Sequence, residues 1–145
     1  MGNKVRLLVV LFVLLAWQAS AAGSLTVESN FTTAQATAAD LDRGYLDYPA
    51  ANRLTVTAEG PWKLYVRTNQ DYLLQRTTPG GSMKPNTDLL WRSDSPFQEL
   101  STSDELVAEG EAGTIQLDVD YRIKLSWLDP PDYYGITLIY TLTSD

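Results

Sequence analysis

The sequence contains no cysteine and no histidine among its 145 residues. Without cysteine the chain can form no disulfide bond, so packing, bound cations or assembly must stabilise its fold. The absence of both residue types also excludes the familiar nucleophile–base pairs of hydrolases and most zinc sites. We therefore expect a protein that is not an enzyme.

Basic side chains are scarce as well, with 11 Lys and Arg against 18 Asp and Glu. Residues 1–21 contain two of the basic residues and none of the acidic ones, so the rest of the chain carries a net charge of −9. Nucleic acids and anionic lipids require clustered Lys and Arg, which this composition does not offer. We expect no nucleic-acid partner.

Long apolar runs are limited to one, Leu7 to Ala16. Lys4 and Arg6 precede it, and the small residues Ala19-Ser20-Ala21 follow it. A basic start, an apolar centre and a small-residue end are typical of an export signal, and the run is too short to span a bilayer as a mature helix.

Residues 1–21 are therefore predicted to be a signal peptide, cleaved after Ala21 or Ala22. Residues 22–145 would then form one domain, located outside the cytoplasm as a secreted or cell-surface protein without a membrane span.

The clearest strand signal covers residues 114–127, where apolar and polar residues alternate without interruption. Its predicted inward-facing residues are Ile115, Leu117, Val119, Tyr121, Ile123, Leu125 and Trp127. Because this stretch exceeds the usual length of a strand, we expect a kink near Asp118-Val119-Asp120 or a crossing between sheets.

Other segments give shorter signals of the same kind. Two alternating runs, 53–58 and 62–67, are joined by Glu59-Gly60-Pro61, which predicts a β-hairpin. Further strands are expected at 25–27, 89–91, 106–108 and 136–142, a long loop or extra hairpin at 69–88, and a short helix at 34–41. Together they predict an all-β fold, a single antiparallel β-sandwich of the immunoglobulin-like kind with seven or eight strands.

The aromatic residues divide into core and surface candidates. Trp62 and Trp127 fall on the apolar faces of their strands and are predicted to be buried. Trp91, beside Arg92, and Tyr72, in the long loop, are predicted to be exposed and to bind a ligand such as a sugar ring. The segment Tyr133-Tyr134-Gly135, before the last strand, is expected to close a corner of the sandwich with a hydroxyl bonded to nearby backbone.

The last strand offers a candidate assembly edge at Ile139 and Tyr140. Ile139 is apolar on a face where its neighbours are threonine. Either another part of the same chain covers it, or this strand meets another copy, since an edge strand presents unpaired backbone groups.

Two sets of carboxylates are candidates for chemistry. Asp40, Asp42 and Asp47 provide oxygen ligands near Gly44, a weak calcium candidate that lacks the remaining ligands of an EF-type loop. Asp118 and Asp120 share a strand face, as a glycosidase pair can, but alternating acids are ordinary on a solvated strand.

The distribution of charge along the chain is uneven. Seven basic and four acidic residues lie between Arg43 and Arg92, whereas residues 93–120 contain eight acidic residues and no basic one. This pattern permits opposite patches that join copies head to tail, or simply a solvated acidic edge.

Two segments resemble the WxL-type domains of bacterial surface proteins. The first is NRLTVTAEGPWKLYV (residues 52–66), with Trp62 and Leu64 in the positions that name the family. The second is PDYYGITLIYTL (residues 131–142), in which Tyr140 stands where the second Trp would be expected. Secreted immunoglobulin-like sandwiches, pilus-like subunits among them, share this strand pattern. The resemblance implies a non-catalytic domain held at the cell surface, often on peptidoglycan.

We therefore predict a non-catalytic exported protein with a structural or adhesive role at the cell surface. Its partners would be other copies of itself, bound through edge strands, or cell-wall polysaccharide. The alternative is a free carbohydrate-binding module with an aromatic platform. No cofactor is expected other than calcium.

Overall fold

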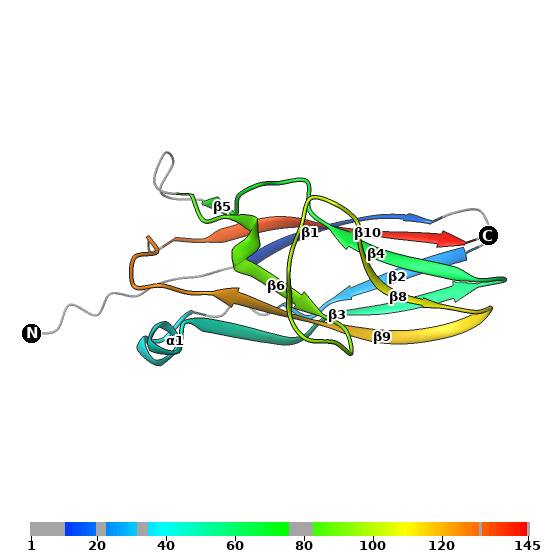
Figure 1. Cartoon of the computed structure of the whole chain (residues 1–145), viewed down its shortest axis with the longest axis horizontal. Helices are drawn as coiled ribbons and strands as arrows, with labels where there is room; N and C mark the ends of the chain where they lie inside the picture. The colour runs from blue at the N-terminus through cyan, green and yellow to red at the C-terminus, as the bar shows by residue number, and fades with distance from the viewer. Residues whose placement is uncertain (1–10, 20–22, 32–34, 76–82, 131, 145) are drawn as a thin grey trace, which may run out of the picture.

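Two β-sheets face each other across one hydrophobic core (Figure 1). The computed structural model describes residues 11–19, 23–31, 35–75, 83–130 and 132–144. Nearly all the regular structure in these residues is β-strand, as the sequence predicts, and the fold is an all-β sandwich.

Sheet A contains the two ends of the described chain. Its strand order is β1 (Leu11–Ala19), β10 (Tyr134–Ser144), β4 (Trp62–Arg67) and β8 (Glu105–Gly110), with the short β5 (Leu74–Gln75) also paired to β10. Sheet B has the order β2 (Gly23–Ser29), β3 (Tyr45–Ala58), β9 (Gly113–Lys124), β6 (Leu89–Arg92) and β7 (Gln98–Glu99). Among the described strands every pairing is antiparallel except that of β1 with β10.

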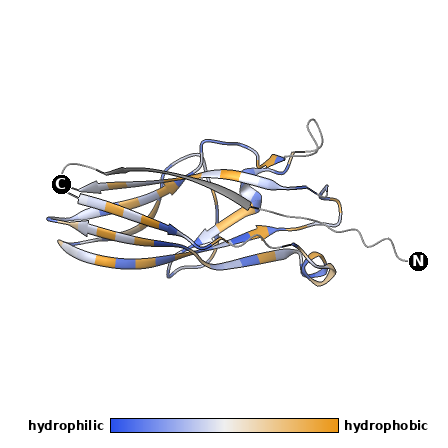
Figure 2. Ribbon diagram, turned by 180° about the vertical axis from the view of Figure 1, so that it is seen from behind, coloured by the Kyte–Doolittle hydropathy of each residue, from blue (hydrophilic) through white to orange (hydrophobic). Residues whose placement is uncertain are grey.

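The core forms because apolar residues alternate with polar ones along the long strands (Figure 2). Trp62 and Leu64 lie in this core, which confirms the burial predicted for both. The indole nitrogen of Trp62 donates to the carbonyl of Glu111 at 2.9 Å. A Cβ at Gly110 would come within 2.8 Å of the Trp62 ring, so the ring packs directly on the backbone of β8.

The predicted hairpin of residues 53–67 is wrong. β3 pairs with β2 and β9 in sheet B, whereas β4 pairs with β10 and β8 in sheet A. Both strands direct an apolar face inward, so Glu59-Gly60-Pro61 carries the chain from one sheet to the other. Alternation alone does not distinguish such a crossing from a hairpin.

Strand β9 is buried over only part of the predicted stretch. Val119, Tyr121 and Ile123 are buried, but Ile115 is 46% exposed and Trp127 lies beyond the end of the strand. The predicted kink lies in the partner strand, because the β3–β9 register shifts between Tyr48 and Asn52.

The remaining elements are short. Helix α1 (Ala38–Arg43) begins four residues later than predicted, because Thr37 caps it and forms a reciprocal capping box with Asp40. In the long loop, Leu73 donates its backbone N–H to Lys84 at 2.8 Å, and a 3₁₀ turn, η1 (Asn86–Asp88), follows. The two arms of the predicted extra hairpin are thus paired, while residues 76–82 lie outside the described part.

Within the described residues, no helix has the length and apolarity needed to cross a membrane.

Candidate functional site

Strand β10 lies between two neighbours in sheet A. On one side it pairs with β4 and β5. On the other it pairs with β1 in parallel over nine consecutive residues, from Leu11 opposite Tyr134 to Ala19 opposite Leu142. The strand that covers this side of β10 therefore lies within the segment predicted to be an export signal; the predicted cleavage points, Ala21 and Ala22, lie outside the described residues.

The side of β10 covered by β1 has no protection of its own. None of the 11 residues of β10 is charged or a proline, and the same is true of β1. At the opposite edge of the sheet, β8 carries Glu105 and Glu109, and the β4–β8 register shifts at Leu64 and Tyr65. Charges and bulges are how natural edge strands avoid pairing with other chains, so β8 is protected and β10 is not.

Strand β1 also closes one side of the sandwich. It lies against β10 in its own sheet and against β2 in sheet B (Figure 1). At the end where β1 leads into β2, a Cβ built on Gly23 would lie 3.2 Å from the Leu142 side chain. The two sheets thus approach closely at this end of β1.

The two residues predicted to form the assembly edge have different environments. Ile139 is half-buried on the outer side of sheet A, opposite Arg67 of β4. Tyr140 has a buried side chain, so only its backbone can contribute to the predicted assembly edge. Its hydroxyl lies 2.6 Å from that of Tyr121 and donates to Asn52 Oδ1 at 2.8 Å.

Of the two predicted ligand-binding aromatic residues, only one is exposed. Trp91 is 0% exposed, so the prediction that its ring is available to a ligand is wrong. It alternates with Leu90 and Arg92 in β6, and the strand turns it into the core. Tyr72 is 47% exposed and forms an isolated bridge with Pro85.

The predicted burial of Trp127 is also wrong, because its side chain is 58% exposed. It lies in the turn between β9 and β10, and its indole nitrogen donates to Asp42 of α1 at 3.0 Å. The neighbouring Leu128 is even more exposed. The strand ends at Lys124, so the alternation no longer governs where Trp127 points.

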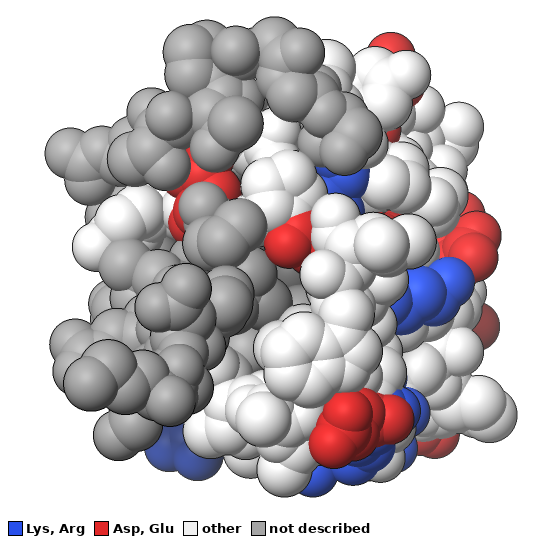
Figure 3. Space-filling model, turned by 90° about the vertical axis from the view of Figure 1, so that its left-hand side faces the viewer, with Lys and Arg blue, Asp and Glu red and all other residues white. Residues whose placement is uncertain are grey.

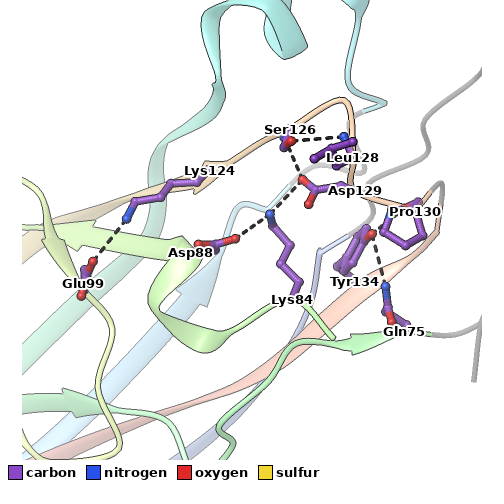
Figure 4. A network of polar contacts seen from close by, with 10 residues as sticks. All are labelled: Gln75, Lys84, Asp88, Glu99, Lys124, Ser126, Leu128, Asp129, Pro130 and Tyr134. Carbon is purple, nitrogen blue, oxygen red and sulfur yellow. Dashed lines mark hydrogen bonds and ion pairs between the residues drawn. The ribbon is translucent and has the colours of Figure 1, made fainter. Parts of the chain in front are cut away.

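A buried lysine joins this turn to the long loop (Figure 4). Lys84 is almost inaccessible and places its ammonium 2.8 Å from Asp88 and 2.9 Å from Asp129. Asp129 also accepts the backbone N–H of Ser126 at 2.9 Å. Tyr72, close to Lys84 through the Leu73 hydrogen bond, therefore belongs to the same end of the molecule as Trp127.

The corner predicted at Tyr133-Tyr134-Gly135 is present, and Tyr134 is the tyrosine that forms it. Its hydroxyl donates to the carbonyl of Pro130, four residues earlier, and accepts from Gln75 Nε2 at 3.3 Å. Burial raises the pKa of this hydroxyl.

The three carboxylates of the calcium candidate have separate protein partners. Asp40 caps α1, and its hydrogen bond from the Thr37 backbone, assisted by Arg43, lowers its pKa. Asp42 accepts from Trp127, and Asp47 forms a bidentate pair with Arg122 at 2.6 and 3.0 Å. Among the described residues, no group of three or more acidic side chains could hold a metal ion.

Asp118 and Asp120 are likewise engaged. Asp118 pairs with Arg53 at 3.0 Å, and Asp120 pairs with Arg92 at 2.9 Å. Asp120 also accepts the backbone N–H of Ala50, at 2.7 Å, within the irregular part of β3. Both carboxylates therefore stabilise sheet B.

These pairs also decide how charge is arranged. The basic segment 43–92 and the acidic segment 93–120 do not form opposed patches, because adjacent strands bring their side chains together. At the end of the molecule that carries α1 and the β9–β10 turn, acidic and basic groups lie side by side and are scattered among uncharged groups (Figure 3).

Sequence reasoning missed a row of stacked side chains on the outer side of sheet B. The guanidinium of Arg122 lies 3.9 Å from the centre of the Tyr45 ring and 4.4 Å from that of Phe97. Arg92 lies over the other end of the row, 4.3 Å from Phe97, and Arg43 lies 4.8 Å from Tyr45. Asp40, Asp47 and Asp120 neutralise these arginines. The row depends on the β3–β9–β6 register, which no local pattern reveals.

No protein-family model matches the sequence, and a search of curated proteins finds no match.

Proposed function

We propose that this protein is an exported, non-catalytic subunit of the cell surface that associates with other polypeptides through the β10 edge. In this proposal residues 1–21 are removed on export and the rest is an immunoglobulin-like sandwich. The observation that carries it is that the strand covering β10 lies inside the predicted signal segment.

Removal of that segment would leave β10 with unpaired backbone groups along nine residues. Unpaired backbone groups of an edge strand readily form hydrogen bonds with strands of other chains. Strand β10 has no charge, proline or bulge that would disfavour this pairing. A role without catalysis agrees with the carboxylates, whose partners are arginines and backbone groups that stabilise the sheet.

The test compares the exported protein with variants at the two edges of sheet A. Mass spectrometry of the secreted chain should show an N-terminus at residue 22 or 23. Light scattering after size exclusion should show association that Ile139→Lys reduces at least tenfold, because a charge on an edge strand disfavours pairing.

Leu106→Lys is the matched control, since Leu106 is an exposed apolar residue of β8 at the other edge. A secreted chain that retains residues 1–21, or one that stays monomeric at millimolar concentration and is not retained on cells, contradicts the proposal.

Attachment to cell-wall glycan is the second candidate. Trp127 and Tyr72 are exposed aromatic residues at one end of the sandwich, and aromatic faces stack on sugar rings. Retention on peptidoglycan or insoluble polysaccharide should fall at least tenfold in Trp127→Ala. It should be kept in Trp127→Phe, which preserves a ring but not the N–H donated to Asp42. Equal retention of the unaltered protein, Trp127→Ala and Trp127→Phe would contradict attachment to glycan through Trp127.

A further inference from the structure

We propose that, once residues 1–21 are removed, the place of β1 is taken by an extended, uncharged, apolar strand of a separate polypeptide, running parallel to β10. This inference rests on the proposed function and names the partner of its edge. We call the place the β10 slot, defined as the side of β10 from Tyr134 to Leu142 together with the adjoining edge of β2.

The length and direction of the proposed partner strand follow from those of β1, which fills the β10 slot in this structure. Strand β1 extends for nine residues, each opposite one residue of β10, and both strands run the same way. Its sequence, LFVLLAWQA, contains no charged residue. An extended segment of this kind therefore fits the slot without displacing any other element of sheet A.

An occupant of the β10 slot contacts both β10 and β2. This requirement favours a free strand over a second folded copy. Strand β1 completes the backbone ladder of β10 and also lies against β2 of sheet B. A second copy that paired its own β10 with this one would satisfy the ladder. However, the residues that alternate inward along that β10 already fill its own core: Tyr134, Ile136, Leu138, Tyr140 and Leu142.

Such a copy would leave the side of the sandwich open. A free strand has no other core to fill, so it can satisfy β10 and cover β2 at once. Adding a strand to an exposed edge is a common mode of peptide recognition, in which the backbone supplies affinity and alternate side chains supply specificity.

The register also predicts which positions of the occupant decide binding. Positions 13, 15 and 17 pair with Ile136, Leu138 and Tyr140, the core-facing residues of β10. Positions 14, 16 and 18 pair with Thr137, Ile139 and Thr141, which alternate to the outer side. Residues opposite each other in a sheet share a face, so polar side chains should be excluded at the first set, whereas uncharged polar ones should be accepted at the second.

The test uses the chain 22–145 and a synthetic peptide of residues 11–19 with terminal lysines for solubility. We expect saturable binding, and at a peptide concentration 100 times the Kd a rise in Tm of roughly 8–10 °C. A peptide with Thr at positions 14 and 16 should bind within tenfold of the parent. One with Asp at 13 and 15 should lose at least 100-fold. The unprocessed chain 1–145, whose slot is filled, should not bind the peptide.

A spin label after position 19 of the peptide tests the direction. A parallel strand places it near Leu142, so the amide signals of residues 141–144 should broaden. Broadening at residues 134–136 means an antiparallel strand and overturns the inference. So does a chain 22–145 that binds no peptide and matches the Tm of the full chain.

A second copy in the slot is a separate outcome. If the chain 22–145 forms dimers that the peptide does not dissociate and Ile139→Lys does, the separate strand is wrong while association through β10 stands. If the chain neither associates, nor binds the peptide, nor is retained on cells, both proposals fail.

Discussion

Tyr121 of sheet B and Tyr140 of sheet A join the two sheets through their hydroxyl groups, 2.6 Å apart in the middle of the core. Tyr140 donates its proton to Asn52 Oδ1, so the proton between the two tyrosines comes from Tyr121. Three buried polar groups from β3, β9 and β10 therefore satisfy one another. This chain of hydrogen bonds fixes how the sheets sit on each other.

Replacing Tyr140 by Phe should lower the free energy of unfolding by about 1–3 kcal/mol. The substitution removes one hydroxyl and leaves both Tyr121 and Asn52 without their buried partner. Urea unfolding followed by fluorescence measures the change. Tyr72→Phe is the control, because Tyr72 is half-exposed and should change stability by less than about 0.5 kcal/mol. Similar losses in both variants would contradict this role for the core hydroxyls.

Stability should also fall in alkali. Burial raises the pKa of Tyr48 to about 12, and it raises the pKa values of Tyr121 and Tyr140 as well. Above pH 10 the unfolded chain loses these protons while the folded chain keeps them, so the unfolded state binds fewer protons and stability declines as pH rises. Below pH 10 these groups contribute no pH dependence.

The decline should approach about 1.4 kcal/mol per pH unit for each such tyrosine above the unfolded pKa of about 10. The double variant Tyr121→Phe/Tyr140→Phe starts from a lower stability at pH 8 and should show a shallower decline between pH 10 and 11.5. Unfolding in urea at a series of pH values measures both slopes. Parallel curves would mean that these hydroxyls are not kept protonated by the fold.

Much of this fold could be predicted from local pattern, because alternation with period two reports directly on burial. Alternation predicts the strands at residues 62–67, 89–91, 106–108 and 136–142 and the burial of Trp62 and Leu64, and the structure has all of these. The prediction of a hairpin at residues 59–61 is wrong because a turn within a sheet and a crossing between sheets have the same composition. The predicted burial of Trp127 is wrong because alternation predicts burial only while the strand continues.

The candidate site was harder to predict because it depends on pairing between distant segments. The sequence predicts an export signal at residues 1–21 and a strand at residues 136–142, but nothing local places one beside the other. The arginine–aromatic row and the Lys84 pairs likewise join residues far apart in the chain. Register, not composition, brings such groups together.

The irregular part of β3 gives a prediction about backbone strain. Ala50 has a φ of 47°, a left-handed conformation that costs an L-residue energy and glycine none. Ala50→Gly should therefore stabilise the protein by roughly 0.5–1 kcal/mol, after the extra entropy of glycine in the unfolded chain is counted. Ala51→Gly is the control, since Ala51 is buried without a positive φ and should lose stability. A loss in both variants would show that Ala50 is not strained.

The buried ammonium of Lys84 should stabilise the fold far more than an exposed one does. Lys84→Met keeps the length of the side chain but leaves Asp88 and Asp129 without the cation between them. Since both carboxylates are partly accessible to water, we expect a loss of about 2–4 kcal/mol. Lys124→Met removes the exposed pair with Glu99 and should cost less than about 1 kcal/mol. Thermal and urea unfolding of both variants measure the difference, and 1 M salt should weaken the Lys124 contribution while leaving most of the Lys84 contribution. Equal losses in the two variants would mean that burial adds nothing to the Lys84 ion pairs.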